Sequence, residues 1–178
     1  VLAVAATDDE TVNAAVEKFF VEGNITTCQQ VFDALETQHP ADFPAGSFGF
    51  VNAEIPVDSL TTGEFAETSG IDGVIQTVRI TSVAADGSSF DWIESTQPAL
   101  GFDAVSIKAG NGRTVYVLSP DGTSGENYAD LNTTRKINSV LFCADNNVTI
   151  ADGGALCDLP SSTLADLCQA AGSTSVVE

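Results

Sequence analysis

The stretch from residue 101 to residue 143 constrains the fold more than any other part of the chain. It contains three β-type segments, at residues 102–108, 114–118 and 137–143. The first two meet at residues 109–112, Ala-Gly-Asn-Gly, which tolerate the positive φ angles of a tight hairpin. The third is apolar on both faces, as is typical of a strand in the middle of a sandwich. The stretch therefore predicts antiparallel β structure, with a long polar loop at 121–136, and contains no catalytic motif.

Segments before this stretch extend the β prediction. Residues 48–55 and 74–83 are predicted strands, and residues 89–94 return antiparallel to the second of these across the turn at 85–87. Phe90 and Trp92 lie on one face of the returning strand, which we expect to be the core face. Strands at this spacing, joined by turns, predict a mainly β fold, an antiparallel β-sandwich of jelly-roll or immunoglobulin-like type.

Helical spacing appears outside these strands. Residues 7–21 begin with the capping box of Thr7 and Glu10 and carry an apolar stripe, which predicts a helix. Residues 27–36 predict a second helix, which ends before Pro40 because the residue preceding a proline disfavours α geometry. His39, the single histidine, is expected to be solvated. A short helix is also predicted near the C-terminal end.

Three regions follow from these patterns. Residues 23–145 are predicted to form the β-sandwich domain, since a chain of 178 residues suffices for one domain with a full core. Residues 1–22 form an N-terminal arm of apolar strand and helix, and residues 146–178 form a C-terminal appendage. The arm begins with six residues that are all apolar: Val1, Leu2, Ala3, Val4, Ala5 and Ala6.

The charge of the chain excludes one class of partner. Asp and Glu number 25 against 6 Lys and Arg, for a net charge of -19. Such a chain repels phosphate backbones, so we expect no nucleic-acid partner. No apolar run reaches the roughly 18 to 20 residues of a membrane span. A secreted protein, adaptation to high salt and Ca²⁺ binding all remain open as explanations of the acidity.

Four cysteines and the absence of methionine are typical of an exported, oxidised protein. Their spacing does not match a zinc site, so disulfides are expected, with three pairings open among Cys28, Cys143, Cys157 and Cys168. Glycosylation sequons occur at Asn24, Asn132 and Asn147.

No motif of a hydrolase, a metalloprotease or a nucleotide-binding protein occurs, and we expect a protein that is not an enzyme. Calcium is the one cofactor that the acidic composition brings into consideration. No EF-hand loop is present. The candidate ligands are Asp121, Glu126 and Asp130 in the predicted polar loop, with Asp145 and Asp152 as a further candidate pair.

An ordered set of motifs resembles a β-sandwich domain of exported and surface-anchored proteins of bacteria and archaea, over about residues 23–145. The set consists of Gly-Asn-Ile-Thr-Thr-Cys at 23–28, Asp-Gly-Ser-Ser-Phe-Asp-Trp at 86–92, Phe-Asp-Ala-Val-Ser-Ile-Lys-Ala-Gly at 102–110, Val-Tyr-Val at 115–117 and Ser-Val-Leu-Phe-Cys at 139–143. Ala109 departs from the pattern, which has glycine there.

The resemblance implies a secreted structural or adhesive domain without catalytic residues. It also implies the pair Cys28–Cys143, which leaves Cys157 with Cys168. Two functions stay open. One is a subunit of an extracellular filament or surface assembly, held by exchange of the apolar strand at residues 1–6 between copies. The other is a monomeric adhesion or ligand-binding module at the cell surface.

Overall fold

A computed structural model describes residues 15–68, 75–97 and 99–146, and the structural statements below concern these residues. They form one helix and nine strands. The elements are β1 (Ala15–Val21), α1 (Cys28–Gln38), β2 (Val51–Val57), β3 (Gly63–Thr68), β4 (Ile75–Val83), β5 (Ser89–Glu94), β6 (Phe102–Lys108), β7 (Arg113–Gly122), β8 (Ser124–Ala129) and β9 (Ser139–Asp145).

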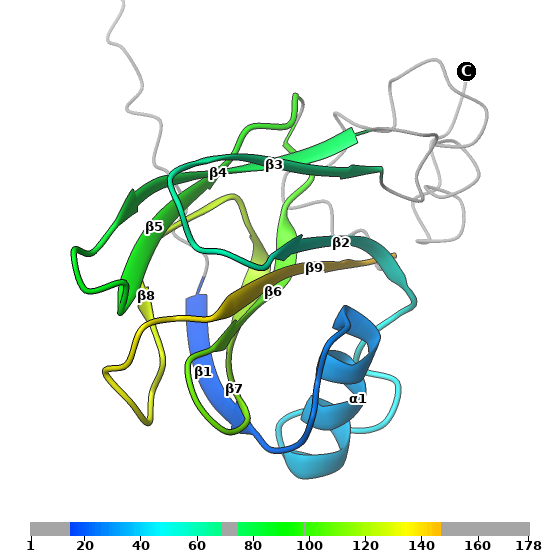
Figure 1. The fold of residues 1–178 in the computed structure, drawn as a ribbon. Coiled ribbons are helices and arrows are strands. Elements are labelled where there is room, and N and C mark those ends of the chain that lie inside the picture. The colour runs from blue at the N-terminus through cyan, green and yellow to red at the C-terminus, as the bar shows by residue number, and fades with distance from the viewer. Residues whose placement is uncertain (1–14, 69–74, 98, 147–178) are drawn as a thin grey trace, which may run out of the picture.

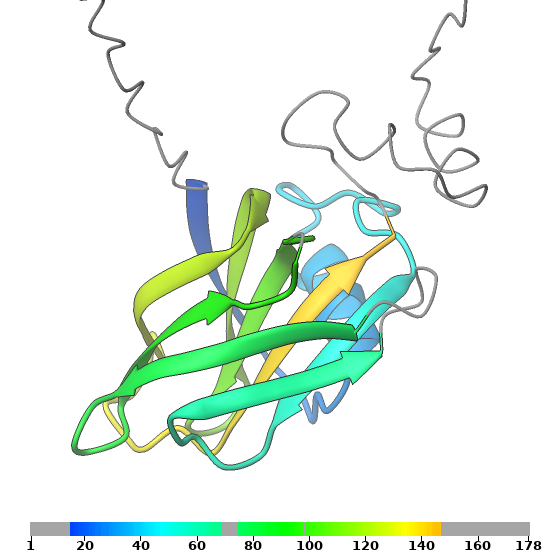
Figure 2. The ribbon, with the colours of Figure 1, turned by 90° about the horizontal axis from the view of Figure 1, so that it is seen from above.

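The strands form two antiparallel sheets (Figures 1 and 2). The larger sheet has the strand order β1-β7-β6-β9-β2, and the smaller has the order β3-β4-β5-β8. All seven strand pairings are antiparallel. The prediction of a mainly β fold built from antiparallel strands is therefore confirmed.

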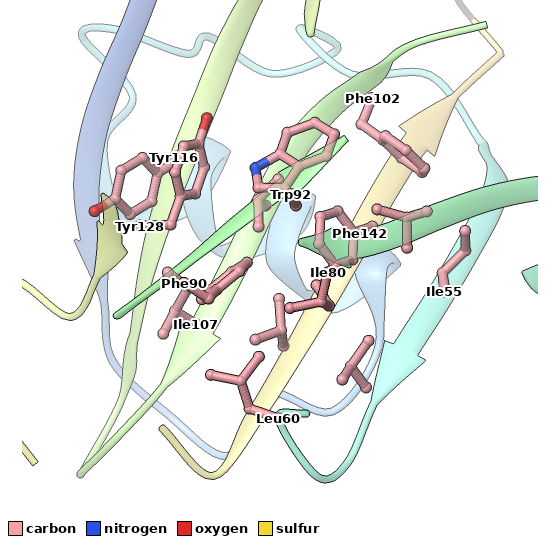
Figure 3. Close-up of a cluster of buried hydrophobic side chains, with 14 of the residues drawn as sticks. Ile55, Leu60, Ile80, Phe90, Trp92, Phe102, Ile107, Tyr116, Tyr128 and Phe142 are labelled. Carbon is pink, nitrogen blue, oxygen red and sulfur yellow. The ribbon is translucent and has the colours of Figure 1, made fainter. Parts of the chain in front are cut away.

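The main hydrophobic core lies between the two sheets (Figure 3). Trp92 of β5 is 2% exposed, and its ring lies 5.1 Å from that of Phe142 in β9 and 5.8 Å from that of Phe102 in β6. Phe90, two residues before Trp92, is also buried, because alternate residues of a strand face the same side. The expected core face of this strand is confirmed.

A second cluster fills the space between α1 and the outer face of the larger sheet. Helix α1 begins after Thr27, whose side chain accepts the Gln30 N–H in a capping box. Its buried face, at Cys28, Val31, Phe32 and Leu35, contacts Ala104 of β6 and Leu141 of β9. These two central strands are thus buried on both faces, as the apolar sequence of 137–143 predicts.

The disulfide Cys28–Cys143 joins the start of α1 to β9, with Cα atoms 5.4 Å apart. It closes a sequence separation of 115 residues and fixes the helix to the sheet. The prediction of this pair is confirmed. The predicted pair of Cys157 with Cys168, the predicted C-terminal helix and residues 1–6 lie outside the described residues.

The predicted helix over residues 7–21 is wrong from residue 15 onward. Residues 15–21 form β1, which pairs with β7 along its whole length. A stripe of Val16, Phe19 and Phe20 fits helical spacing, but valine and phenylalanine also favour strands, and pairing with β7 decides between the two. The larger sheet therefore begins before the predicted domain boundary at residue 23.

Two strands were not predicted because their sequences are too polar. β3 reads Gly-Glu-Phe-Ala-Glu-Thr and β8 reads Ser-Gly-Glu-Asn-Tyr-Ala, each with at most two large apolar or aromatic side chains. The predicted loop at 121–136 therefore contains a strand. Both β3 and β8 are edge strands, so each needs only one neighbour and one buried face.

Trp92→Ala should lower the free energy of unfolding by about 3 to 5 kcal/mol, because it leaves a cavity between the sheets. Urea denaturation followed by circular dichroism measures this loss. Ile93→Ala is the matched control, since Ile93 is the next residue, faces outward and is 45% exposed. Equal losses in the two variants would contradict the assignment of the core face.

Replacing both Cys28 and Cys143 by alanine should lower the free energy of unfolding by about 5 kcal/mol in the chain-entropy account of a loop of this size. Urea denaturation of the double variant measures the effect. Peptide mapping without reduction checks the pairing itself, and a peptide joining Cys28 to Cys157 or Cys168 would refute it.

Candidate functional site

The larger sheet extends one strand beyond the smaller sheet on the side of β1 and β8. The Tyr128 ring of β8 stacks on the Tyr116 ring of β7 with centroids 4.0 Å apart, so the edge strand β8 lies opposite β7. β1 pairs with β7 on the side away from β6. No described strand therefore lies opposite β1.

The inward face of β1 is consequently only partly covered. Val16, Lys18 and Phe20 are directly opposite Leu118, Tyr116 and Thr114 in the pairing of β1 with β7, so they face the same side of the sheet as the core residues Tyr116 and Leu118. Val16 is 42% exposed, and the Lys18 ammonium lies 5.0 Å from the centroid of the Tyr116 ring. We call this face, together with the free edges of β1 and β8, the open side.

Among the four edge strands, β1 has the most regular backbone, although Glu17 and Lys18 give it charged side chains as Glu64 does for β3. Its seven residues contain neither proline nor glycine and pair with β7 without a bulge. β2 carries Pro56, which cannot donate to a ladder, and β8 is interrupted where its pairing with β5 shifts and Asn127 has φ of 55°. β3 carries charged Glu64 beside Arg79. Long, regular and partly apolar edges such as β1 are templates for strand addition.

Acidic side chains gather at one end of the larger sheet. Asp103 near the start of β6, Asp121 near the end of β7 and Asp145 at the end of β9 meet there, because neighbouring antiparallel strands bring the start of one beside the end of the next. Asp103 Oδ2 accepts the Asp145 N–H at 2.7 Å, and Asp145 Oδ2 accepts the Gly49 N–H at 2.7 Å. Asp103 and Asp121 each influence the pKa of the other.

Glu94 at the end of β5 joins this group from the smaller sheet. It accepts the N–H groups of Leu100 and Gly101 at 3.0 and 2.7 Å, and the fully buried Gln76 amide donates to it at 3.2 Å. Gly101, at φ of 82°, passes so close to Asp121 that an added Cβ would lie 2.5 Å from the Asp121 Cβ. We call Glu94, Asp103, Asp121 and Asp145 the acidic cluster.

Burial makes ionisation of this cluster costly. Burial and, after it, the negative charge of Asp121 together raise the pKa of Asp103 to about 8. Burial also raises the pKa of Asp121 to about 6. The pKa of Glu94 is raised by burial, against the lowering effect of its hydrogen bonds.

The three predicted calcium ligands do not come together. Asp121 belongs to the acidic cluster, Glu126 is exposed on β8, and Asp130 lies at the opposite end of β7, beside the turn between β6 and β7. Within residues 15–68, 75–97 and 99–146, no group of three or more His, Cys, Asp or Glu side chains is arranged to hold a metal ion.

The remaining predicted residues are placed as follows. Asn24 and Asn132 are exposed, as glycosylation requires, and Asn147 lies outside the described residues. His39 is half-buried rather than solvated, which corrects the prediction. Its Nε2 lies 2.8 Å from the Phe20 carbonyl oxygen and its ring packs edge-on against Phe19, so it ties the end of α1 to β1.

A shallow polar pocket of about 250 Å³ lies at the tip of the β6–β7 hairpin. It is lined by Gly110, Asn111, Asp130, Asn132, Thr133 and Arg135. Asp130 Oδ1 is already engaged there, since it accepts the N–H groups of Asn132 and Thr133 at 2.8 and 3.2 Å.

No protein-family model matches the chain, and comparisons with curated proteins and with solved structures return no match. In the part of the chain that the structure describes, no helix has the length and apolar character needed to cross a membrane. Function must therefore be argued from the open side, the acidic cluster and the pocket themselves.

Sequence reasoning did not find Asp103 or Glu94, and it named Asp145 only as a candidate calcium ligand with Asp152, which lies outside the described residues. A signal is nevertheless present, because each is an acidic residue within two positions of the end of a mainly apolar strand. Which strand ends share an edge depends on the strand order β7-β6-β9, and that order joins segments far apart in the sequence.

Proposed function

We propose that this protein is a structural subunit of an extracellular assembly, in which an apolar strand from one copy adds to the open side of the next. The two antiparallel sheets with a shared core support assignment to the β-sandwich class, of jelly-roll or immunoglobulin-like type. The buried disulfide between Cys28 and Cys143 supports secretion into an oxidising environment. The motif resemblance to surface-anchored domains points the same way.

The observation that carries this proposal is the open side. The outer edge of β1, which no other described strand pairs with, offers main-chain hydrogen bonds, while Val16 and Phe20 offer apolar contact on the inward face. A strand added to a free sheet edge gains affinity from the backbone ladder and specificity from side-chain contacts. On the open side, the single strand β1 supplies both the backbone edge and the apolar side chains.

Residues 1–6 are the donor within this chain. Six residues in extended conformation span about 20 Å, close to the length of the seven-residue β1. All six are apolar and uncharged, so their approach is not opposed by the net charge of -19. Because donor and acceptor belong to one chain, the contact repeats head to tail and builds a fibre.

The competing arrangement has residues 1–6 folding back onto β1 of the same copy. Eight residues, 7–14, separate the donor from β1, which is enough for a hairpin connection. This arrangement predicts a monomer. Exchange between copies predicts polymers that grow with concentration and with added salt or Ca²⁺, because cations screen the repulsion between acidic subunits.

Deletion of residues 1–6 should convert an assembling protein into a monomer. Sedimentation velocity and negative-stain microscopy, at high protein concentration with and without Ca²⁺, measure the outcome. A synthetic peptide of residues 1–14 should then bind the truncated protein and appear as an added strand in NMR spectra. Filaments formed by the truncated protein, or a full-length protein that stays monomeric in Ca²⁺, would contradict the proposal.

Val16→Glu should raise the protein concentration needed for assembly by tenfold or more, because it places a carboxylate against the incoming apolar strand. Ile93→Glu is the matched control. Ile93 is 45% exposed against 42% for Val16, but it lies on the outer face of the smaller sheet, away from the open side. Equal effects of the two substitutions would point to general charge repulsion instead of strand addition.

A monomeric ligand-binding module is the second candidate, favoured by the hairpin-tip pocket. Its lining offers one carboxylate, one guanidinium and two amide side chains, a set suited to a small polar ligand such as a sugar. Two results together would favour this module. The protein would bind a member of a sugar panel and lose that binding in Asn111→Ala, and deletion of residues 1–6 would leave its oligomeric state unchanged.

A further inference from the structure

A strand can add to the edge of β1 in two orientations, and these place its flanking residues at opposite ends of the molecule. β1 runs from the end of the larger sheet that carries the acidic cluster, where Ala15 pairs with Ser119, to the end that carries the β6–β7 hairpin, where Val21 pairs with Arg113 (Figure 1). We call these the cluster end and the hairpin end. If the donor is parallel to β1, its residues 7–14 leave the accepting copy at the hairpin end. If it is antiparallel, they leave at the cluster end.

We propose that residues 1–6 add to β1 of a second copy in the parallel orientation, so that the cluster end of each copy faces the hairpin end of the next. This inference rests on the proposed function and gives the donor a direction. It also adds a second contact, between residues 8–10, Asp-Asp-Glu, and basic side chains at the hairpin end of the neighbour.

The basic side chains of the chain are concentrated at the hairpin end. All six lysines and arginines lie among the described residues, and four of them are at this end: Lys108 at the end of β6, Arg113 at the start of β7, and Arg135 and Lys136 between β8 and β9. The segment after β8 is held there because the Asn138 N–H donates to the Lys108 carbonyl at 2.7 Å. The other two, Lys18 and Arg79, lie in the middle of β1 and β4.

Three of these side chains at the hairpin end are accessible to a partner. Arg135 and Lys136 are exposed and Lys108 is half-buried, whereas Arg113 is 3% exposed and donates to the Ile25 carbonyl. Within residues 15–68, 75–97 and 99–146, the one ion pair is that of Arg79 with Glu64. The three accessible cations therefore form no ion pair with a described carboxylate.

The two ends differ in charge as a result. The hairpin end also carries acidic residues, which follow β1, β2, β4 and β8: Glu22, Asp58, Asp86 and Asp130. Acidic and basic residues are thus balanced there. The cluster end carries acidic residues without a lysine or arginine. Burial, and after it the charges of Asp145 and Glu94, raise the pKa of Asp121 to about 6, so further negative charge is unfavourable at that end. Residues 8–10 therefore meet cations at the hairpin end and repulsion at the cluster end.

The length of the connecting segment separates exchange between copies from folding back. Eight residues, 7–14, join the donor to β1. Within one copy this length allows an antiparallel hairpin, but a parallel neighbour needs a crossover connection of about a dozen residues or more. The parallel orientation is therefore open only to a strand from another copy.

The orientation also decides which assembly forms. An antiparallel donor brings two cluster ends together, so two copies can exchange donors reciprocally and close as a dimer. A parallel donor joins unlike ends, so the contact is not returned and the row of copies stays open. Parallel pairing is slightly less stable per residue than antiparallel pairing, and the attraction at the hairpin end acts against that difference.

A spin-labelled donor peptide determines the orientation. The peptide of residues 1–14, labelled at Val1, is added to the protein that lacks residues 1–6, after circular dichroism has checked that this protein keeps the β fold of the full chain. Parallel addition should broaden the amide NMR signals of Ala15, Val16 and Ser119 at the cluster end. Broadening at Val21 and Arg113 instead would overturn the proposal and leave strand addition intact. A peptide that does not bind would contradict the proposed function as well.

Arg135→Glu tests the second contact in the full chain. It should raise the protein concentration needed for assembly about two- to fivefold at low salt, because a carboxylate then faces residues 8–10 of the neighbour. Arg79→Glu is the matched control, since it makes the same change of charge at an exposed arginine in the middle of β4. The difference between the two variants should vanish at about 1 M salt, where charges are screened within roughly 3 Å.

A charge swap completes the test. Combining Arg135→Glu with Asp9→Lys should restore assembly at the concentration that the unmodified chain needs. Equal effects of Arg135→Glu and Arg79→Glu, or a double variant that assembles no better than Arg135→Glu alone, would overturn the contact at the hairpin end.

Discussion

The contact between α1 and the outer face of the larger sheet is the interaction on which the rest of the structure depends. It buries the second face of β6 and β9, so these two strands lose access to water on both sides. The disulfide Cys28–Cys143 holds the helix in this position. Arg113 is buried beneath it, where it donates to the Ile25 carbonyl at 2.9 Å and to Ser139 Oγ at 3.0 Å. Burial lowers the pKa of Arg113 to about 10.

One end of the larger sheet carries both the acidic cluster and the start of β1. Ala15 pairs with Ser119, two residues before Asp121, so the N-terminal segment joins the sheet beside the cluster. The helix side of the larger sheet is covered, whereas β1 is an edge strand among the described residues. Stable proteins normally protect such edges, which is why β1 carries the functional proposal.

Much of the fold was readable because local pattern and tertiary environment agree. The strands β5 and β6, the start of the helix at Thr27 and the turn ending at Gly87 were predicted within a residue or two. Residues 15–21 were predicted as helix because their apolar residues fit helical spacing. The same residue types also favour a strand, and pairing with β7 stabilises the strand. β3 and β8 were not predicted because edge strands can form from sequences with few apolar residues.

The acidic cluster was not predicted because it depends on which strand ends lie side by side in the sheet.

The sequence by itself determined that this chain is acidic and rich in β structure, and the motif resemblance implied the pair Cys28–Cys143. These properties follow from composition, alternation and motif order, which are local or nearly local. Only the tertiary structure decided that β1 is an edge strand among the described residues and that Asp103, Asp121 and Asp145 meet at one end of the larger sheet. Both depend on strand order, because hydrogen bonds between strands join residues that no local pattern relates.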